Sequence, residues 1–190
     1  MALIRIIPPE FDVELAIAYA TSNNVTGKKI YCNSGCWLHE DAANALLIAI
    51  GYANDLGLKF CIFDAFRPVE AQWKLWNHSP NPNFLVHPRK GSPHSRGIAI
   101  DLTLLKRDGN NFLNMGTDFD NFSEKAFHNS QFITPEVRQN RYTLLGLMVS
   151  AGWDYYLNEW WHYQLFNSKN YELLSDSDAG TGLMKENGVE

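Results

Sequence analysis

The sequence has little positive charge, and its Lys and Arg residues form no cluster. Sixteen Lys and Arg stand against 21 Asp and Glu, which gives a formal net charge of −5 at pH 7 and a pI near 5.7. Binding to nucleic-acid phosphates requires clustered positive side chains. The composition therefore argues against a nucleic-acid partner and favours a small-molecule partner.

Long hydrophobic runs are also missing. Residues 1–7 are apolar apart from Arg5, and Pro8 and Pro9 end this run. It is too short for the core of a signal peptide or for a membrane span. We therefore expect a cytoplasmic protein with no membrane partner.

Several motifs that mark common enzyme classes do not occur. There is no G-x-S-x-G, G-x-x-x-x-G-K, G-x-G-x-x-G or H-E-x-x-H, which disfavours serine hydrolases, nucleotide-binding folds and helix-based zinc proteases. The three cysteines, Cys32, Cys36 and Cys61, are an odd number without paired spacing, so reduced thiols are expected.

The length and patterning predict one domain over residues 1–190, with a tail after about residue 170 that lies at the periphery. The expected fold class is α+β, a mainly antiparallel sheet flanked by helices with a zinc site at the sheet, because helices and strands do not alternate regularly. Apolar periodicity and turn residues predict helices at Glu40–Leu56, Val69–Asn77 and Pro135–Ala151, and strands at Lys59–Phe66, Gly97–Leu105 and Glu159–Phe166.

Two segments carry residues suited to metal chemistry. The first, SPHSRGIAID, contains His94 and Asp101, which a single straight strand would separate by about 23 Å. His94 is therefore expected in the loop before the strand that carries Asp101. The second, EWWH, contains Glu159 and His162. Two histidines and one carboxylate leave an open position on zinc for a reactive water, and Glu159 is then available as a general base.

Each of these residues also has a structural interpretation. His94 can cap a turn, Asp101 can be a buried hydrogen-bonded carboxylate, and the EWWH segment can be the edge of an aromatic core. Taken one at a time, these interpretations are favoured over a metal site. The other four histidines are interpreted as surface residues: His39, His78, His87 and His128.

Taken together, the two segments resemble the VanX-type D-alanyl-D-alanine dipeptidases, whose patterns S-x-H-x-x-G-x-A-x-D and E-x-W-H are both matched in full. The similarity covers roughly residues 10 to 166. Further segments that carry it are Asn24–Lys28, Asp64–Pro68, Met115–Asp120 and Gln139–Arg141. Phe66 departs from the family, whose members commonly have tyrosine there.

This resemblance implies a zinc-dependent hydrolysis of the dipeptide D-Ala-D-Ala to two D-alanine. It implies one Zn²⁺ per chain, held by His94, Asp101 and His162. Glu159 would act as the acid/base residue, and Arg67 would face the developing oxyanion. A guanidinium stays charged at any working pH, which suits that role.

The resemblance also implies substrate-binding residues. Asp120 would receive the ammonium group of the dipeptide, Ser92 would help to hold its carboxylate, and Trp161 would form a wall of the pocket. Spacing alone does not separate Asp120 from the neighbouring Asp118. Arg96, inside the first motif, is interpreted as structural.

Two other functions stay open. A D,D-carboxypeptidase or muropeptide peptidase of the same superfamily would use the same ligands on longer peptides, although Gln164 stands where lysostaphin-type endopeptidases have a second histidine. A zinc-binding domain without catalysis is the second alternative, and the presence of both Glu159 and Arg67 argues against it. The oligomeric state cannot be predicted from these patterns.

Overall fold

A mixed, mainly antiparallel sheet forms the centre of the protein in the computed structural model, which describes residues 3–109 and 111–185. Its five strands have the order β2-β4-β5-β7-β6, and a two-stranded ribbon, β1-β3, lies beside it. Only the β2–β4 pair within this sheet is parallel. The predicted α+β class with a mainly antiparallel sheet is confirmed. The strands are β1 Leu3–Arg5, β2 Val13–Leu15, β3 Trp37–His39, β4 Leu58–Asp64, β5 Ala99–Lys106, β6 Asp154–Tyr155 and β7 His162–Gln164.

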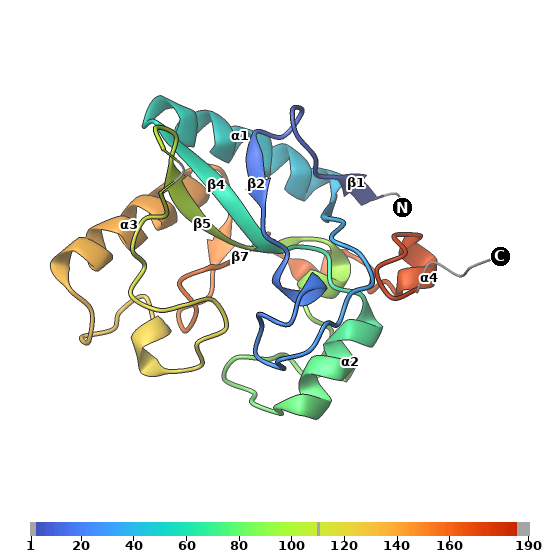
Figure 1. Cartoon of the computed structure of the whole chain (residues 1–190). Helices are drawn as coiled ribbons and strands as arrows, with labels where there is room; N and C mark the ends of the chain where they lie inside the picture. Colours follow the sequence, from blue (N-terminus) through green and yellow to red (C-terminus); the bar gives the residue numbers. More distant parts are fainter. Residues whose placement is uncertain (1–2, 110, 186–190) are drawn as a thin grey trace.

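Among the described residues, three longer α-helices and one short α-helix pack around the strands. In Figure 1, α1 lies along the top and α3 at the left, whereas α2 extends below the sheet. Within residues 3–109 and 111–185, no helix is both long and apolar enough to cross a membrane. The helices are α1 Glu40–Asp55, α2 Val69–His78, α3 Pro135–Ser150 and α4 Asp176–Ala179.

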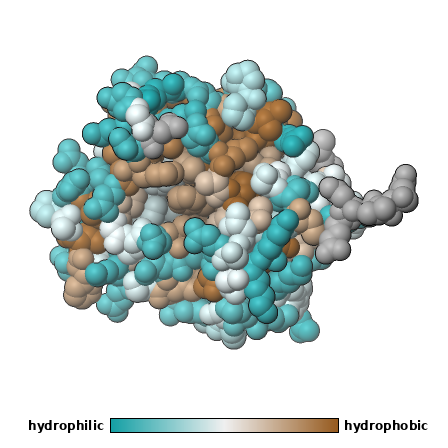
Figure 2. Space-filling view, viewed as in Figure 1, coloured by the Kyte–Doolittle hydropathy of each residue, from teal (hydrophilic) through white to brown (hydrophobic). Residues whose placement is uncertain are grey.

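The central strands β4 and β5 are buried on both faces, which explains their nearly continuous apolar sequence. Phe60 and Ile62 of β4 are fully buried on one face, and Cys61 and its partner Thr103 are buried on the other. On the face shown in Figure 2, hydrophilic residues occupy most of the rim and hydrophobic residues gather toward the middle, over the strands. The polar groups that β4 and β5 carry are therefore held in a closely packed framework.

A buried arginine joins two segments that lead to the site. Arg141 of α3 donates hydrogen bonds to the carbonyl groups of Met115, Lys125 and Phe127, at 2.6–2.9 Å. Its guanidinium also lies over the ring of Trp160, 5.8 Å from the centroid. Arg141 thereby fixes the 115–127 segment against the turn that carries the EWWH motif.

The last predicted strand is shorter than expected. The prediction was Glu159–Phe166, but β7 contains only His162–Gln164. The residues before it form a turn, in which the backbone N–H of Glu159 bonds to Tyr156 O and that of Trp160 bonds to Ala126 O. The turn moves Glu159 out of the sheet and places it beside His162.

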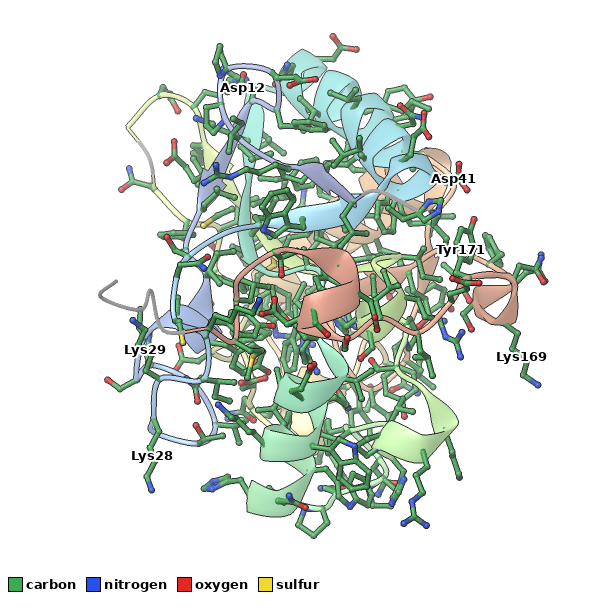
Figure 3. All side chains as sticks on the ribbon, turned by 90° about the vertical axis from the view of Figure 1, so that its right-hand side faces the viewer. Asp12, Lys28, Lys29, Asp41, Lys169 and Tyr171 are labelled. Carbon is green, nitrogen blue, oxygen red and sulfur yellow. The ribbon has the colours of Figure 1, made fainter. Side chains whose placement is uncertain are left out.

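Parts of the segment after residue 170, which was predicted to lie at the periphery, pack into the fold within residues 171–185. Leu183 is fully buried, and the carboxylate of Asp176 accepts bonds from Thr181, Leu183 and Met184 at 2.6–3.1 Å. Farther back, Tyr171 lies beside Asp41 at the start of α1 (Figure 3), and its hydroxyl donates to that carboxylate at 2.9 Å. The polar sequence of this segment gave no sign of the packing, because its buried polar groups form hydrogen bonds with one another.

Two of the four histidines predicted at the surface are buried. His39 is 8% exposed, and its Nδ1 accepts a bond from Asp41 N, which caps α1. His128 is 6% exposed and packs edge-on against Tyr155 and Tyr163. Burial lowers the pKa of His128 to about 4, so this histidine is neutral at pH 7. Both therefore belong to the structural core.

The chain turns sharply just before β5, and this turn requires glycine at residue 97. Gly97 has φ +69°, in the left-handed region, and it follows a single 3₁₀ turn at His94–Arg96. A Cβ here would lie 2.8 Å from Leu3 Cδ2 and 3.0 Å from His39 N. A side chain would therefore strain the backbone and push against β1 and β3 together.

We expect Gly97→Ala to lower the free energy of unfolding by about 1–3 kcal/mol, from the left-handed backbone and the steric overlap. Gly51→Ala is the matched control, because nothing lies within 4 Å of the added Cβ. Gly51 lies within helix α1, where alanine should stabilise by about 0.5–1 kcal/mol. Urea denaturation measures both, and equal effects of the two substitutions would contradict this interpretation.

Candidate active site

Three polar residues form a row across the middle of the sheet. In the strand register Asp101 of β5 lies opposite His162 of β7 on one side and opposite Asp64 of β4 on the other. Directly opposed residues point to the same face of a sheet. A register shift between Ile62 and Asp64 accompanies the placement of Asp64 in this row. All three side chains are buried.

His94 joins this row from the 3₁₀ turn that precedes β5. Its Nε2 lies 3.1 Å from His162 Nδ1 and 3.3 Å from Asp101 Oδ2. His162 Nδ1 lies 3.0 Å from Asp101 Oδ1. The backbone carbonyl of His94 accepts a bond from Arg67 N at 3.1 Å, which fixes the turn against the end of β4. The predicted ligands His94, Asp101 and His162 thus form one buried group in which a metal ion can be held.

The hydrogen bonds behind the two rings show that these residues fit a metal ion. His94 Nδ1 lies 2.7 Å from Ala65 O, and His162 Nε2 lies 3.1 Å from Gln164 Oε1. Both oxygens only accept, so each of these ring nitrogens carries the hydrogen when the ring is neutral. The lone pairs of His94 Nε2 and His162 Nδ1 then face each other, which is unfavourable unless a proton or a cation lies between them. Metal-bound histidines usually have the same arrangement, in which the ring nitrogen that does not bind the metal donates to an acceptor such as a backbone carbonyl.

Arg67 lies against this group with its guanidinium held on several sides. Nε donates to Asp64 at 2.8 Å, and Nη2 lies 3.4 Å from Asp101 Oδ2. The ring of Tyr19 stacks with the guanidinium, 5.0 Å from ring centroid to Cζ. Asp64 is held from behind by the hydroxyl of Tyr31 at 2.8 Å. Arg67 is only 4% exposed and is therefore a fixed positive charge at the site.

Glu159 is placed beside the proposed ligands without belonging to their group. Its Oε2 lies 3.9 Å from His162 Nδ1, and the residue is 6% exposed. Burial raises the pKa of Glu159 to about 8. A carboxyl group with such a pKa can accept and release a proton near neutral pH, as a general acid/base requires.

The site opens into a cavity of about 390 Å³ that the other predicted residues also line. Asp120 accepts bonds from the hydroxyl of Tyr19 at 3.1 Å and from Val25 N at 3.2 Å, and burial raises its pKa to about 7. Asp118 is exposed and does not line this cavity. Of the two neighbouring acids, Asp120 is therefore the one that faces the site.

Ser92 and Trp161 also line the cavity. The hydroxyl oxygen of Ser92 accepts a bond from His94 N at 3.2 Å, which leaves its hydrogen available for a ligand. Trp161 is almost fully buried and packs edge-on against Phe119. Arg96 lines the cavity too, while its Nη1 donates to Tyr171 O and holds the C-terminal segment.

Sequence reasoning did not assign roles to several residues that shape the site. Asp64 and Tyr19 hold Arg67, and Gln164 orients His162. One signal for Gln164 was present, because residues two apart on a strand share a face. Gln72 lies in helix α2, and its contact with Arg67 at 3.0 Å depends on how that helix returns toward the sheet.

A buried group of two histidines and one aspartate, with a carboxylate and a guanidinium beside it on a cavity, is typical of metal-dependent hydrolases. Comparison with known families defines the class further. The family model described as D-ala-D-ala dipeptidase, Peptidase_M15, matches residues 5–176. The chain belongs to this family of metallopeptidases.

Curated relatives named D-alanyl-D-alanine dipeptidase cover most of the chain. The Escherichia coli K12 protein is 41% identical over 165 residues, 87% of this chain and 85% of that protein. The Enterococcus faecium protein is 34% identical over 167 residues, 77% and 83% of the two chains. The Streptomyces coelicolor protein is 30% identical over 172 residues, again 77% and 83%.

We expect Gln164→Leu to weaken the binding of a divalent metal by about 10–100-fold, because the hydrogen bond that orients His162 is lost. Competition with a chromogenic chelator measures the affinity for Zn²⁺. Gln131→Leu is the matched control, since Gln131 is exposed and bonds only to Asn129 O among the contacts described. An unchanged zinc affinity in Gln164→Leu would contradict the role of Gln164.

Proposed function

We propose that this protein hydrolyses D-Ala-D-Ala to two D-alanine with one Zn²⁺ ion held by His94, Asp101 and His162. The observation that carries the proposal is the convergence of His94 Nε2, His162 Nδ1 and the Asp101 carboxylate within 3.0–3.3 Å. When bound, the zinc ion would polarise the peptide carbonyl and lower the pKa of the attacking water.

Glu159 is the proposed general acid/base. It would take the proton of the attacking water and pass it to the nitrogen of the leaving D-alanine. Burial raises its pKa to about 8 without a metal ion, and a cation held beside it would lower this value again, toward the range in which both transfers are accessible. Its position next to His162 keeps it close to the proposed zinc ligands.

Arg67 is proposed to stabilise the negative charge that develops on the peptide oxygen. Its guanidinium is already desolvated and held by Asp64 and Tyr19, so little reorganisation is needed during the reaction. Preorganised charges of this kind typically contribute about 3–4 kcal/mol to the lowering of the barrier.

The proposed substrate contacts would limit the length of the peptide. Asp120 would pair with the ammonium group, Ser92 would donate to the carboxylate, and Trp161 would form the wall between them. A longer peptide would bring an uncharged amide to Asp120 and leave its half-buried charge without an ammonium partner, which disfavours binding. A cytoplasmic location belongs to this proposal as well, supported by three cysteines that are all free.

The function is tested by D-alanine release from D-Ala-D-Ala, with L-Ala-L-Ala, D-Ala-D-lactate and a pentapeptide ending in D-Ala-D-Ala assayed in parallel at saturating zinc. Release from the D,D-dipeptide alone is the expected result. Cleavage of the pentapeptide would indicate a D,D-carboxypeptidase instead. No release from any compound would favour a zinc-binding domain without catalysis.

We expect Glu159→Ala to keep bound zinc but to lower kcat by about 10²–10⁴-fold, since general acid/base catalysis is lost. Zinc content by mass spectrometry and steady-state kinetics are measured on the same preparation. Glu172→Ala, at an exposed glutamate that does not line the cavity, should behave as the unmodified protein. Unchanged turnover in Glu159→Ala would refute this mechanism.

The pKa of Asp120, about 7, predicts a pH dependence of substrate capture. Asp120 pairs with an ammonium group only when ionised, and Glu159 must also be ionised to accept the proton of water, so kcat/KM should fall up to a hundredfold per pH unit well below pH 7. In Asp120→Asn, kcat/KM should be low throughout, and the acidic decline should become shallower, at most tenfold per pH unit, because only Glu159 still titrates. Asp118→Asn serves as the control with an unchanged profile, and an identical decline in Asp120→Asn would assign it to another group.

A further inference from the structure

A buried glutamine connects Arg67 to a wall of the cavity. Gln72 of α2 is 1% exposed. Its Oε1 accepts from Arg67 Nη1 at 3.0 Å, and its Nε2 donates to Val86 O at 2.8 Å. The guanidinium only donates and the carbonyl only accepts, so the orientation of the amide is determined by its partners.

The loop that carries Val86 forms one side of the cavity. Its residues Pro82, Phe84 and Leu85 also line the site. At another point of the same loop, the hydroxyl of Tyr156 donates to Asn83 O at 2.9 Å, and Tyr156 lines the cavity as well. The loop therefore spans the site between Gln72 and Tyr156, so a ligand in the cavity would contact it.

The other contacts of Arg67 lead toward the proposed metal group. Its Nε and Nη2 lie against Asp64 and Asp101, two carboxylates in the row across the sheet. Gln72 supplies an uncharged acceptor to Nη1, the remaining nitrogen of the guanidinium. The backbone supports this contact, because Gln72 N bonds to Pro68 O, in the residue directly after Arg67.

We propose that Gln72 is a positioning residue that sets the orientation of Arg67 and joins it to the loop wall at Val86. An amide is suited to this place, since it accepts from the guanidinium and donates to the carbonyl at the same time. The inference rests on the proposed function, in which Arg67 meets the developing oxyanion, and a small misplacement of such a group can cost about 10²-fold in rate.

Two substitutions with side chains of similar size to glutamine distinguish the hydrogen bond to Arg67 from the hydrogen bond to Val86. Gln72→Glu keeps an acceptor for Arg67 but loses the donor to Val86 and adds a negative charge beside the guanidinium, so KM should rise several-fold and kcat should fall, but less than in Gln72→Met. Gln72→Met loses both bonds, so kcat should also fall about 10–100-fold. In an Arg67→Lys background, which removes Nη1, Gln72→Met should lower kcat less than threefold, because coupled residues are not additive.

A direct readout of Arg67 does not depend on activity. Nuclear magnetic resonance of ¹⁵N-labelled arginine reports how fast the guanidinium nitrogens exchange position, and the Arg67 signal is identified by its loss in Arg67→Lys. The exchange should be slow in the unmodified protein and in Gln72→Glu, but faster in Gln72→Met. Leu75→Ala, a buried residue of the same helix, controls for general destabilisation: it should lower Tm without accelerating the exchange.

The outcomes of the two proposals can be told apart. An unmodified protein without D-Ala-D-Ala hydrolysis refutes the proposed function, while the exchange measurement still decides the role of Gln72. An active protein in which Gln72→Met leaves kcat and the exchange of Arg67 unchanged overturns the inference alone. A full 10–100-fold loss from Gln72→Met in the Arg67→Lys background would also overturn it, because Gln72 would then act through another residue.

Discussion

The antiparallel pairing of β5 with β7 is the constraint on which the rest of the site depends. It places Asp101 opposite His162 in a part of the sheet that is buried, so their side chains share one face. Gly97 then allows the chain to turn so that His94 meets both of them. Burying these polar side chains costs free energy unless they are paired with one another or bind a cation.

Charge balance explains why these groups belong together. Asp64 and Asp101 are buried against the guanidinium of Arg67, and Glu159 is buried nearby, beside His162. Burial raises the pKa values of Asp64 and Glu159, which reflects the cost of holding several negative charges there. A divalent cation at the His94–Asp101–His162 group would offset that cost. The same cation would lower the raised pKa of Glu159, which favours the ionised carboxylate that accepts a proton from water.

Much of the site could be predicted because its ligands lie in two short, distinctive segments. His94 was expected in a loop and Asp101 in a strand, as the structure has them. Gln72 was missed because its role depends on where helix α2 packs, which spacing does not show. Gln164 shares a strand face with His162, but that spacing does not show which ring nitrogen it contacts. Asp176 was missed for a related reason: its carboxylate bonds to the backbone of the tail itself, so a polar segment packs into the core.

Anomalous X-ray diffraction at the zinc absorption edge, on crystals of the zinc-loaded protein, tests the central claim most directly. The account predicts one strong peak per chain, in contact with His94 Nε2, His162 Nδ1 and the Asp101 carboxylate. A peak only at another site, with these three side chains bonded directly to one another, would contradict it.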